Sequence, residues 1–155
     1  MSLAMVEAVH SRLELANEQL DVALELFLSK RSFVASLTLA GAAEEIFGKA
    51  LTHKGKKTTL EYEHTVIAPV EEFLRQKPLT WKVFAKEKNR VRNAAKHMGE
   101  KTELDLVADL EDEALWMVVR ACDNYQRLDL PSTDRMNEFN EWFLKTVVGV
   151  DTGDA

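Results

Sequence analysis

Between Phe33 and Ala43 the chain is nearly free of polar side chains, and this run constrains the fold more than any other stretch. Helical spacing of apolar residues extends the segment to about residues 32–52. A helix that is apolar on most of its sides must be buried on most of them, so we expect it to lie centrally in a helical bundle. Gly41 and Gly48, seven residues apart on one face, would let a neighbouring helix approach closely.

The remaining apolar pattern also has helical spacing, and no segment shows the alternation of a strand. It predicts helices over residues 6–28, 60–76 (with a bend or restart at Pro69), 81–98 and 104–128, and a last helix capped by Ser132 or Thr133. We therefore predict an all-α fold, an antiparallel bundle of four long helices with short extra ones. Residues 1–148 are expected to form one domain and residues 149–155 a frayed acidic tail. The apolar stripes that support these helices are Val6, Val9, Leu13, Ala16, Leu20, Ala23 and Phe27; Leu110, Ala114, Met117, Ala121 and Leu128; and Met136, Phe139, Phe143 and Val147.

Length and composition are those of a single globular domain, with 155 residues, 46% of them hydrophobic and 30% charged. Cys122 is the only cysteine, so the chain forms no internal disulfide, and we expect a reducing compartment. No apolar run approaches the length of a membrane span, and no signal peptide is visible. These features together predict a cytoplasmic protein without a membrane partner.

The charge is unevenly distributed along the chain. Residues 49–101 contain thirteen Lys or Arg and six Asp or Glu, although the whole chain has a net charge of −6. An acidic protein with one basic region is suited to a local anionic ligand and unsuited to coating nucleic acid indiscriminately. The most basic part, residues 75–101, has nine Lys or Arg against two acids.

That basic part contains the sequence Arg92-Asn93-Ala94-Ala95-Lys96-His97. We expect a helix from Trp81, capped by Thr80, to Met98, stopped by Gly99. On a helix His97 would face away from the apolar stripe, and Asn93, four residues earlier, would lie close enough to orient its ring. Arg92 would lie about 140° around the axis from His97, which is awkward for one shared site. Either the helix breaks before Gly99, or a second copy of the motif faces the first across a two-fold axis; a solvated polar face without chemistry is the third possibility.

The motif Arg92-Asn93-x3-His97 resembles that of the HEPN (higher eukaryotes and prokaryotes nucleotide-binding) superfamily, which is Arg, a polar residue, three variable residues and His. The upstream run from Leu39 to Lys49, with its Ala-Glu-Glu sequence, resembles the second helix of bacterial members of the abortive-infection and toxin type. The resemblance covers roughly residues 10–130. It implies a helical bundle, usually a homodimer, that often acts as a metal-independent ribonuclease and is often neutralised by a nucleotidyltransferase-like antitoxin. Some relatives bind without cutting, so the fold does not settle the activity.

The resemblance also implies roles for individual residues. His97 would be the general base at a ribose 2′-hydroxyl, or the acid at the leaving oxygen, and Arg92 would stabilise charge on the phosphate. Asn93 would hold the imidazole, and the substrate-binding residues Lys96, Arg90 and Lys86 would guide the RNA backbone. Glu44 and Glu45 have two interpretations: one of them steers the Arg or the His of the site, or one is solvated while the other pairs with a basic helix. No cofactor or metal is expected.

Two other interpretations come from the residues themselves. Glu7-x-x-His10 and Glu61-x-x-His64 match the Glu-x-x-His ligand pair of di-iron helical bundles, but both pairs lie near the beginnings of expected helices instead of in mid-bundle. The basic loop at residues 53–57, with Gly55 as a helix C-cap, would either contact phosphate or complement the helix dipole. The functional alternative to a ribonuclease is a non-catalytic module that binds RNA or a nucleotide, or an adaptor dimer.

Overall fold

The computed structural model describes residues 7–99, 103–151 and 153, and all regular secondary structure within these residues is helical. The all-α prediction is therefore confirmed. The helices are α1 (Arg12–Leu28), α2 (Phe33–His53), α3 (Thr59–Arg75), α4 (Trp81–Lys88), α5 (Arg90–Lys96), α6 (Leu110–Arg127) and α7 (Asp134–Phe143), followed by one π-helical turn, η1 (Leu144–Val148).

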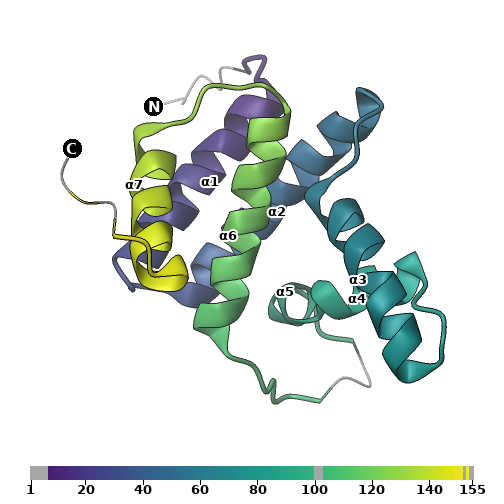
Figure 1. The fold of residues 1–155 in the computed structure, drawn as a ribbon. Helices are drawn as coiled ribbons and strands as arrows, with labels where there is room; N and C mark the ends of the chain where they lie inside the picture. Colours follow the sequence, from purple (N-terminus) through teal and green to yellow (C-terminus); the bar gives the residue numbers. More distant parts are fainter. Residues whose placement is uncertain (1–6, 100–102, 152, 154–155) are drawn as a thin grey trace.

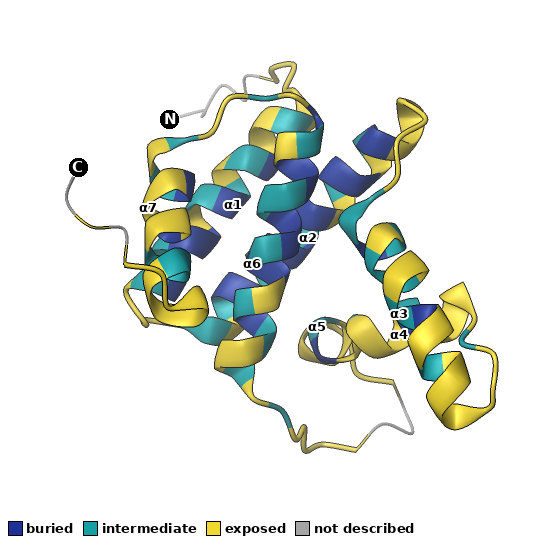
Figure 2. Ribbon diagram, in the orientation of Figure 1, coloured by how far each residue is buried: buried dark blue, intermediate teal, exposed yellow. Residues whose placement is uncertain are grey.

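Helix α2 is central, in agreement with its apolar sequence. It packs most extensively against α6 and α1, and α7 lies on the far side of α1 (Figure 1). Figure 2 shows the buried surfaces of these helices facing one another. Phe27 of α1 joins α2 and α7 through edge-to-face contacts with Phe33, Phe139 and Trp142. The largest fully buried apolar side chains are Leu20, Leu24, Leu37, Phe47, Leu51, Val91 and Val118.

Helix α1 begins later than the apolar stripe predicts. Its N-cap is Ser11, whose hydroxyl accepts a hydrogen bond from the Glu14 backbone N–H. Val9, which the stripe included, lies before the helix and is fully exposed because no other element covers it. Val6 is outside the described residues. The prediction of a helix through the residues before Ser11 was wrong for residues 7–10.

Helix α6 also begins later, at Leu110 instead of Leu104. The Asp109 carboxylate accepts from the Asp112 backbone N–H, and the acidic first turn stabilises the positive end of the helix dipole. Leu104 and Val107 precede the helix and are exposed. The last helix, α7, is capped by Thr133, one of the two residues predicted for that role.

Helices α3 and α4 form an arm beside the other helices (Figure 1). Thr58 begins α3 with a capping box in which its hydroxyl and the Glu61 carboxylate each accept a backbone N–H. The helix then runs through Pro69 without interruption. Figure 2 shows that most of the arm is exposed.

The described part of the tail, residues 149–151 and 153, is non-helical and exposed. Residues 152, 154 and 155, which belong to the predicted tail, lie outside the described residues. Among the described helices, none combines the length and the apolar character needed to cross a membrane.

Candidate functional site

Arg92 lies across the middle of α2, where a glycine makes room for it. A β-carbon at Gly41 would be 2.4 Å from Arg92 Cδ and 2.9 Å from Cγ, which is closer than packed carbon atoms can approach. The face of α2 that contains Gly41 was expected to let a neighbouring helix approach closely. At Gly41 the group that approaches is the side chain of Arg92. Only 11% of the Arg92 side chain is exposed.

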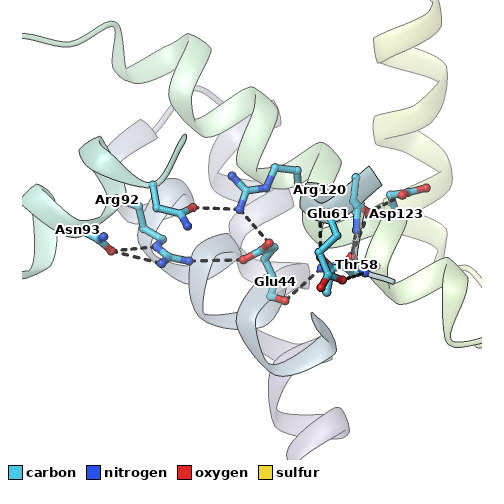
Figure 3. Close-up of polar contacts among 10 residues, drawn as sticks. Glu44, Thr58, Glu61, Arg92, Asn93, Arg120 and Asp123 are labelled. Atoms are coloured by element: carbon cyan, nitrogen blue, oxygen red, sulfur yellow. Dashed lines mark hydrogen bonds and ion pairs between the residues drawn. The ribbon is translucent and has the colours of Figure 1, made fainter. Parts of the chain in front are cut away.

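Glu44, one helical turn beyond Gly41, joins two arginines. Its carboxylate accepts from Arg92 Nη1 at 3.4 Å and from Arg120 Nη2 of α6 at 2.8 Å (Figure 3). The Glu44 side chain is 9% exposed and that of Arg120 is 5% exposed, so these charges are largely removed from water. The interpretation of Glu44 as the partner of a basic helix agrees with this geometry, whereas Glu45 is exposed.

Asn89 interrupts the helix that was expected to run from Trp81 to Met98. It has φ −103° and ψ 5°, so α4 ends before it and α5 begins after it. Its side-chain oxygen accepts from Arg120 Nη2 at 3.0 Å. Arg120 thus binds both the Glu44 carboxylate and Asn89, the residue between α4 and α5.

The side chain of Asn93 contacts Arg92 and not the imidazole of His97. Its side-chain oxygen accepts from Arg92 Nε and Nη2, both at 3.3 Å (Figure 3). The expected role of Asn93 as the group that holds the imidazole is therefore not seen. The reason is that α5 ends at Lys96, and His97 continues in an extended conformation with φ −132° and ψ 135°. The His97 backbone N–H still donates to the Asn93 carbonyl oxygen at 2.9 Å, but no hydrogen bond joins the two side chains.

His97 is exposed at the end of α5, and its imidazole makes no hydrogen bond within the described part of the chain. The helix does break before Gly99, as one of the sequence alternatives required. The break does not bring His97 into the cleft that contains Arg92, whose lining residues do not include it.

The three predicted substrate-binding cations are exposed and are not gathered in one place. Arg90 donates from Nη2 to the Val107 carbonyl at 3.4 Å, across to the segment before α6. Lys96 lines a groove beside α2, and Lys86 lies on the exposed surface of α4. Neither lysine forms an ion pair within the described residues.

Two grooves lie next to each other along α2. The first, of about 290 Å³, contains Arg92 and is lined by Glu44, Thr58, Trp81 and Asn89 among others. The second, of about 490 Å³, has an apolar floor that includes Leu13 and Ile46, with basic groups at its rim. Both grooves include Glu45 and Lys49, so they adjoin. The basic residues of the second groove are Arg12, Lys49, His53 and Lys96.

The Glu-x-x-His pairs do not form the inward-facing set that a di-metal site needs. Glu7 and His10 precede α1 and are exposed. The Glu61 carboxylate accepts the Thr58 backbone N–H, while His64 Nε2 lies 2.8 Å from the Leu79 carbonyl oxygen. The described residues contain no cluster of three metal-ligating side chains.

Cys122 is also not a suitable nucleophile. Burial, with a smaller contribution from the Asp123 carboxylate, raises the pKa of its thiol to about 12.

The sequence analysis missed Arg120 and Asn124. Both belong to the buried side of α6, where Asn124 Nδ2 donates to the Glu44 carbonyl at 3.3 Å and Asn124 Oδ1 accepts from Thr59 N at 2.9 Å. A signal was present, because Asn124 and Arg120 lie three residues after and one residue before Ala121 of the core stripe. A polar residue within such a stripe needs a buried partner.

Comparisons with known proteins add no assignment to this geometry. The chain matches no protein-family model, no curated protein and no solved structure.

Proposed function

We propose that the chain is a metal-independent endoribonuclease of the HEPN type, with a helical bundle that carries its motif, and that it acts as a homodimer in the cytoplasm. The observation that carries the proposal is the state of Arg92. Glu44 and Asn93 fix its guanidinium, and three of its five N–H groups donate to them. One N–H on Nη1 and one on Nη2 donate to no described residue. Arg92 lines an open cleft, and in the proposed site these two N–H groups bind phosphate oxygens there.

The charge of the cluster suits this role. One carboxylate lies between two guanidinium groups, so Glu44, Arg92 and Arg120 together carry one net positive charge. Because the cluster is fixed by the fold, it needs no rearrangement when negative charge develops on a phosphate. The adjoining basic groove, which includes Lys96 and Lys49, offers a path for the rest of the RNA backbone.

His97 supplies the proton transfer in the proposed reaction. Its neutral imidazole removes the proton of a ribose 2′-hydroxyl, and the 2′-oxygen attacks phosphorus. The bond from phosphorus to the 5′-oxygen breaks, and that oxygen takes a proton from solvent water, to which the His97 imidazolium releases its own proton. The products are a 2′,3′-cyclic phosphate and a 5′-hydroxyl. DNA resists because it lacks the 2′-hydroxyl.

One observation favours the second candidate, a non-catalytic dimer that binds RNA or a nucleotide. The imidazole of His97 has no hydrogen-bond partner among the described residues to orient it, whereas Arg92 is firmly held. An arginine alone can bind phosphate without cutting the RNA. In either case a nucleotidyltransferase-type antitoxin is a candidate partner.

The test is cleavage of generic RNA in EDTA by the wild-type chain and by His97→Ala. We expect cleavage by the wild type, and loss of cleavage in the variant with unchanged thermal unfolding, because His97 is exposed and supports no other residue. His10→Ala, at another exposed histidine, is the matched control and should cleave normally. No cleavage by the wild type would favour the binding module, and full activity in His97→Ala would refute the assignment of the base.

A further inference from the structure

The outer face of α3 carries an apolar stripe that the described chain leaves open except at Tyr62, whose ring lies beneath the Arg127 guanidinium at 4.1 Å and the Lys57 ammonium at 5.8 Å. Val66, Val70, Phe73 and Leu74 are 71%, 57%, 77% and 69% exposed, and Tyr62 continues the stripe toward the start of the helix. At about 100° per residue these five side chains fall within roughly one third of the helix circumference. Single exposed apolar residues need no explanation, but a contiguous stripe marks an interaction surface.

The stripe is not the face by which α3 attaches to the protein. The inner face holds the buried residues Leu60 and Ala68, and His64, whose ring packs against Trp81 and Phe84 of α4. α3 is therefore apolar on two opposite sides. In Figure 2 the outer side of the arm is exposed along its length.

Helix α3 is only weakly attached to the rest of the described chain. Pro69 lies in its interior, where the missing N–H removes one backbone hydrogen bond of the helix. Its contacts with the rest of the chain, mainly with α4 and α6, are sparse. A partner that buries the outer stripe would supply the packing that the arm lacks in one chain.

The size of the stripe fits a second copy of the chain. The exposed parts of its five side chains amount to about 600 Å² per protomer, and two such surfaces together reach the range of about 1,200–2,000 Å² of a specific interface. Two identical helices related by a two-fold axis across their length pack antiparallel, with the same surface on both sides.

The apolar residues of the stripe suit the same arrangement. With the axis at Val70, near the middle of the stripe, Val66 lies opposite Leu74 of the other copy, and the two Val70 side chains meet at the axis.

We propose that this α3 stripe, Tyr62, Val66, Val70, Phe73 and Leu74, is the interface by which two copies of the chain pair antiparallel about Val70. The inference rests on the proposed function at one point, because a site shared between chains requires a dimer. Its evidence, the exposure and the area of the stripe, is independent of the chemistry.

The first experiment measures association by sedimentation velocity and equilibrium in the absence of RNA. The wild type should dimerise with a dissociation constant in about the micromolar range or tighter. Phe73→Glu and, separately, Val66→Glu should weaken dimerisation by about 100-fold, because each places two charges in the apolar centre of a two-fold interface. Leu104→Glu replaces an apolar residue that is 86% exposed outside the stripe, and it should have no effect. Circular dichroism verifies that each variant stays folded.

The second experiment tests the register by cross-linking. Val70→Cys should form a disulfide between the two copies under oxidising conditions, because the axis places the two residues opposite each other. Val83→Cys, at an exposed residue of α4 outside the stripe, is the control and should not cross-link. A wild type that is monomeric at about 100 μM, or a dimer unaffected by Phe73→Glu and Val66→Glu, would overturn the interface. A dimer in which Val70→Cys does not cross-link would overturn the antiparallel register. Because no RNA is present, these outcomes are independent of the His97→Ala result.

Discussion

Glu44 connects the core of the protein to the motif. It occupies a buried position of the central helix, and among the described residues its counter-charges are Arg92 and Arg120. Arg120 in turn holds Asn89, at which the motif segment changes direction. The placement of the motif arginine therefore depends on a carboxylate that lines the cleft and is only 9% exposed. Glu45, the next residue, points to solvent and has no such connection.

We predict that Glu44→Gln lowers the free energy of unfolding by about 3 kcal/mol, because the buried guanidinium of Arg120 then loses its counter-charge. Glu45→Gln, the matched control, should change it by less than about 0.5 kcal/mol. Denaturant unfolding of the two variants measures the difference. If both variants change the free energy of unfolding by the same small amount, the charge of the Glu44 carboxylate does not stabilise the fold. That result would contradict the prediction.

At the scale of helices, the capping residues determine where each element begins. Four of these caps share one hydrogen bond, in which the cap hydroxyl accepts the backbone N–H of the residue three positions later. They are Ser11, Thr58, Thr80 and Thr133. The cap at Thr58 matters most, because α3 depends on local interactions more than the helices of the core do. Its methyl group also packs 3.3 Å from where a β-carbon on Gly48 would lie, so the beginning of the arm lies directly against α2.

Thr58→Ala should therefore cost about 1 kcal/mol. We expect the loss to appear first as faster hydrogen exchange of the α3 amides, since local opening of the arm leaves the core intact. Thr65→Ala is the control: its hydroxyl donates only to the Glu61 carbonyl within the same helix, on an exposed face, and its removal should be nearly neutral. Similar exchange rates in the two variants would show that the capping box does not hold the arm.

At the scale of the whole molecule, the decisive question is how Arg92 and His97 come to act together. Arg92 lies in the cleft against α2, whereas His97 lies outside that cleft on the exposed end of α5. A single chain thus presents a fixed phosphate-binding group and a separate imidazole. A two-fold pair of chains supplies two of each and so can complete a site from both.

If the site is shared, mixing inactive His97→Ala with inactive Arg92→Ala chains should restore about a quarter of wild-type cleavage, since half of randomly paired dimers are mixed and each mixed dimer has one intact site of two. Subunit exchange is verified with differently tagged chains. No cleavage despite complete exchange would place each site within one chain. The result distinguishes a site built from two chains from a site built from one, and it does so whichever surface forms the dimer.

Much of the architecture was predictable from local patterns. The apolar run of α2, the periodicity of α1 and α6, and the caps Thr80 and Thr133 depend on neighbours within a few residues, and the structure agrees with them. Helix beginnings were less predictable. Residues 7–10 and 104–107 continue an apolar pattern but are exposed, and the caps at Ser11 and Asp109 begin the helices later.

The sequence by itself determined an all-helical chain with a buried central helix, a basic segment and the spacing of Arg92 and His97. Only the tertiary structure decided that Glu44 holds Arg92, that Gly41 makes room for it, and that Arg120 holds the bend at Asn89. These contacts join residues 31 to 76 positions apart. Local periodicity contains no information about such pairs, because a buried charge is stable only where the fold brings its counter-charge to it.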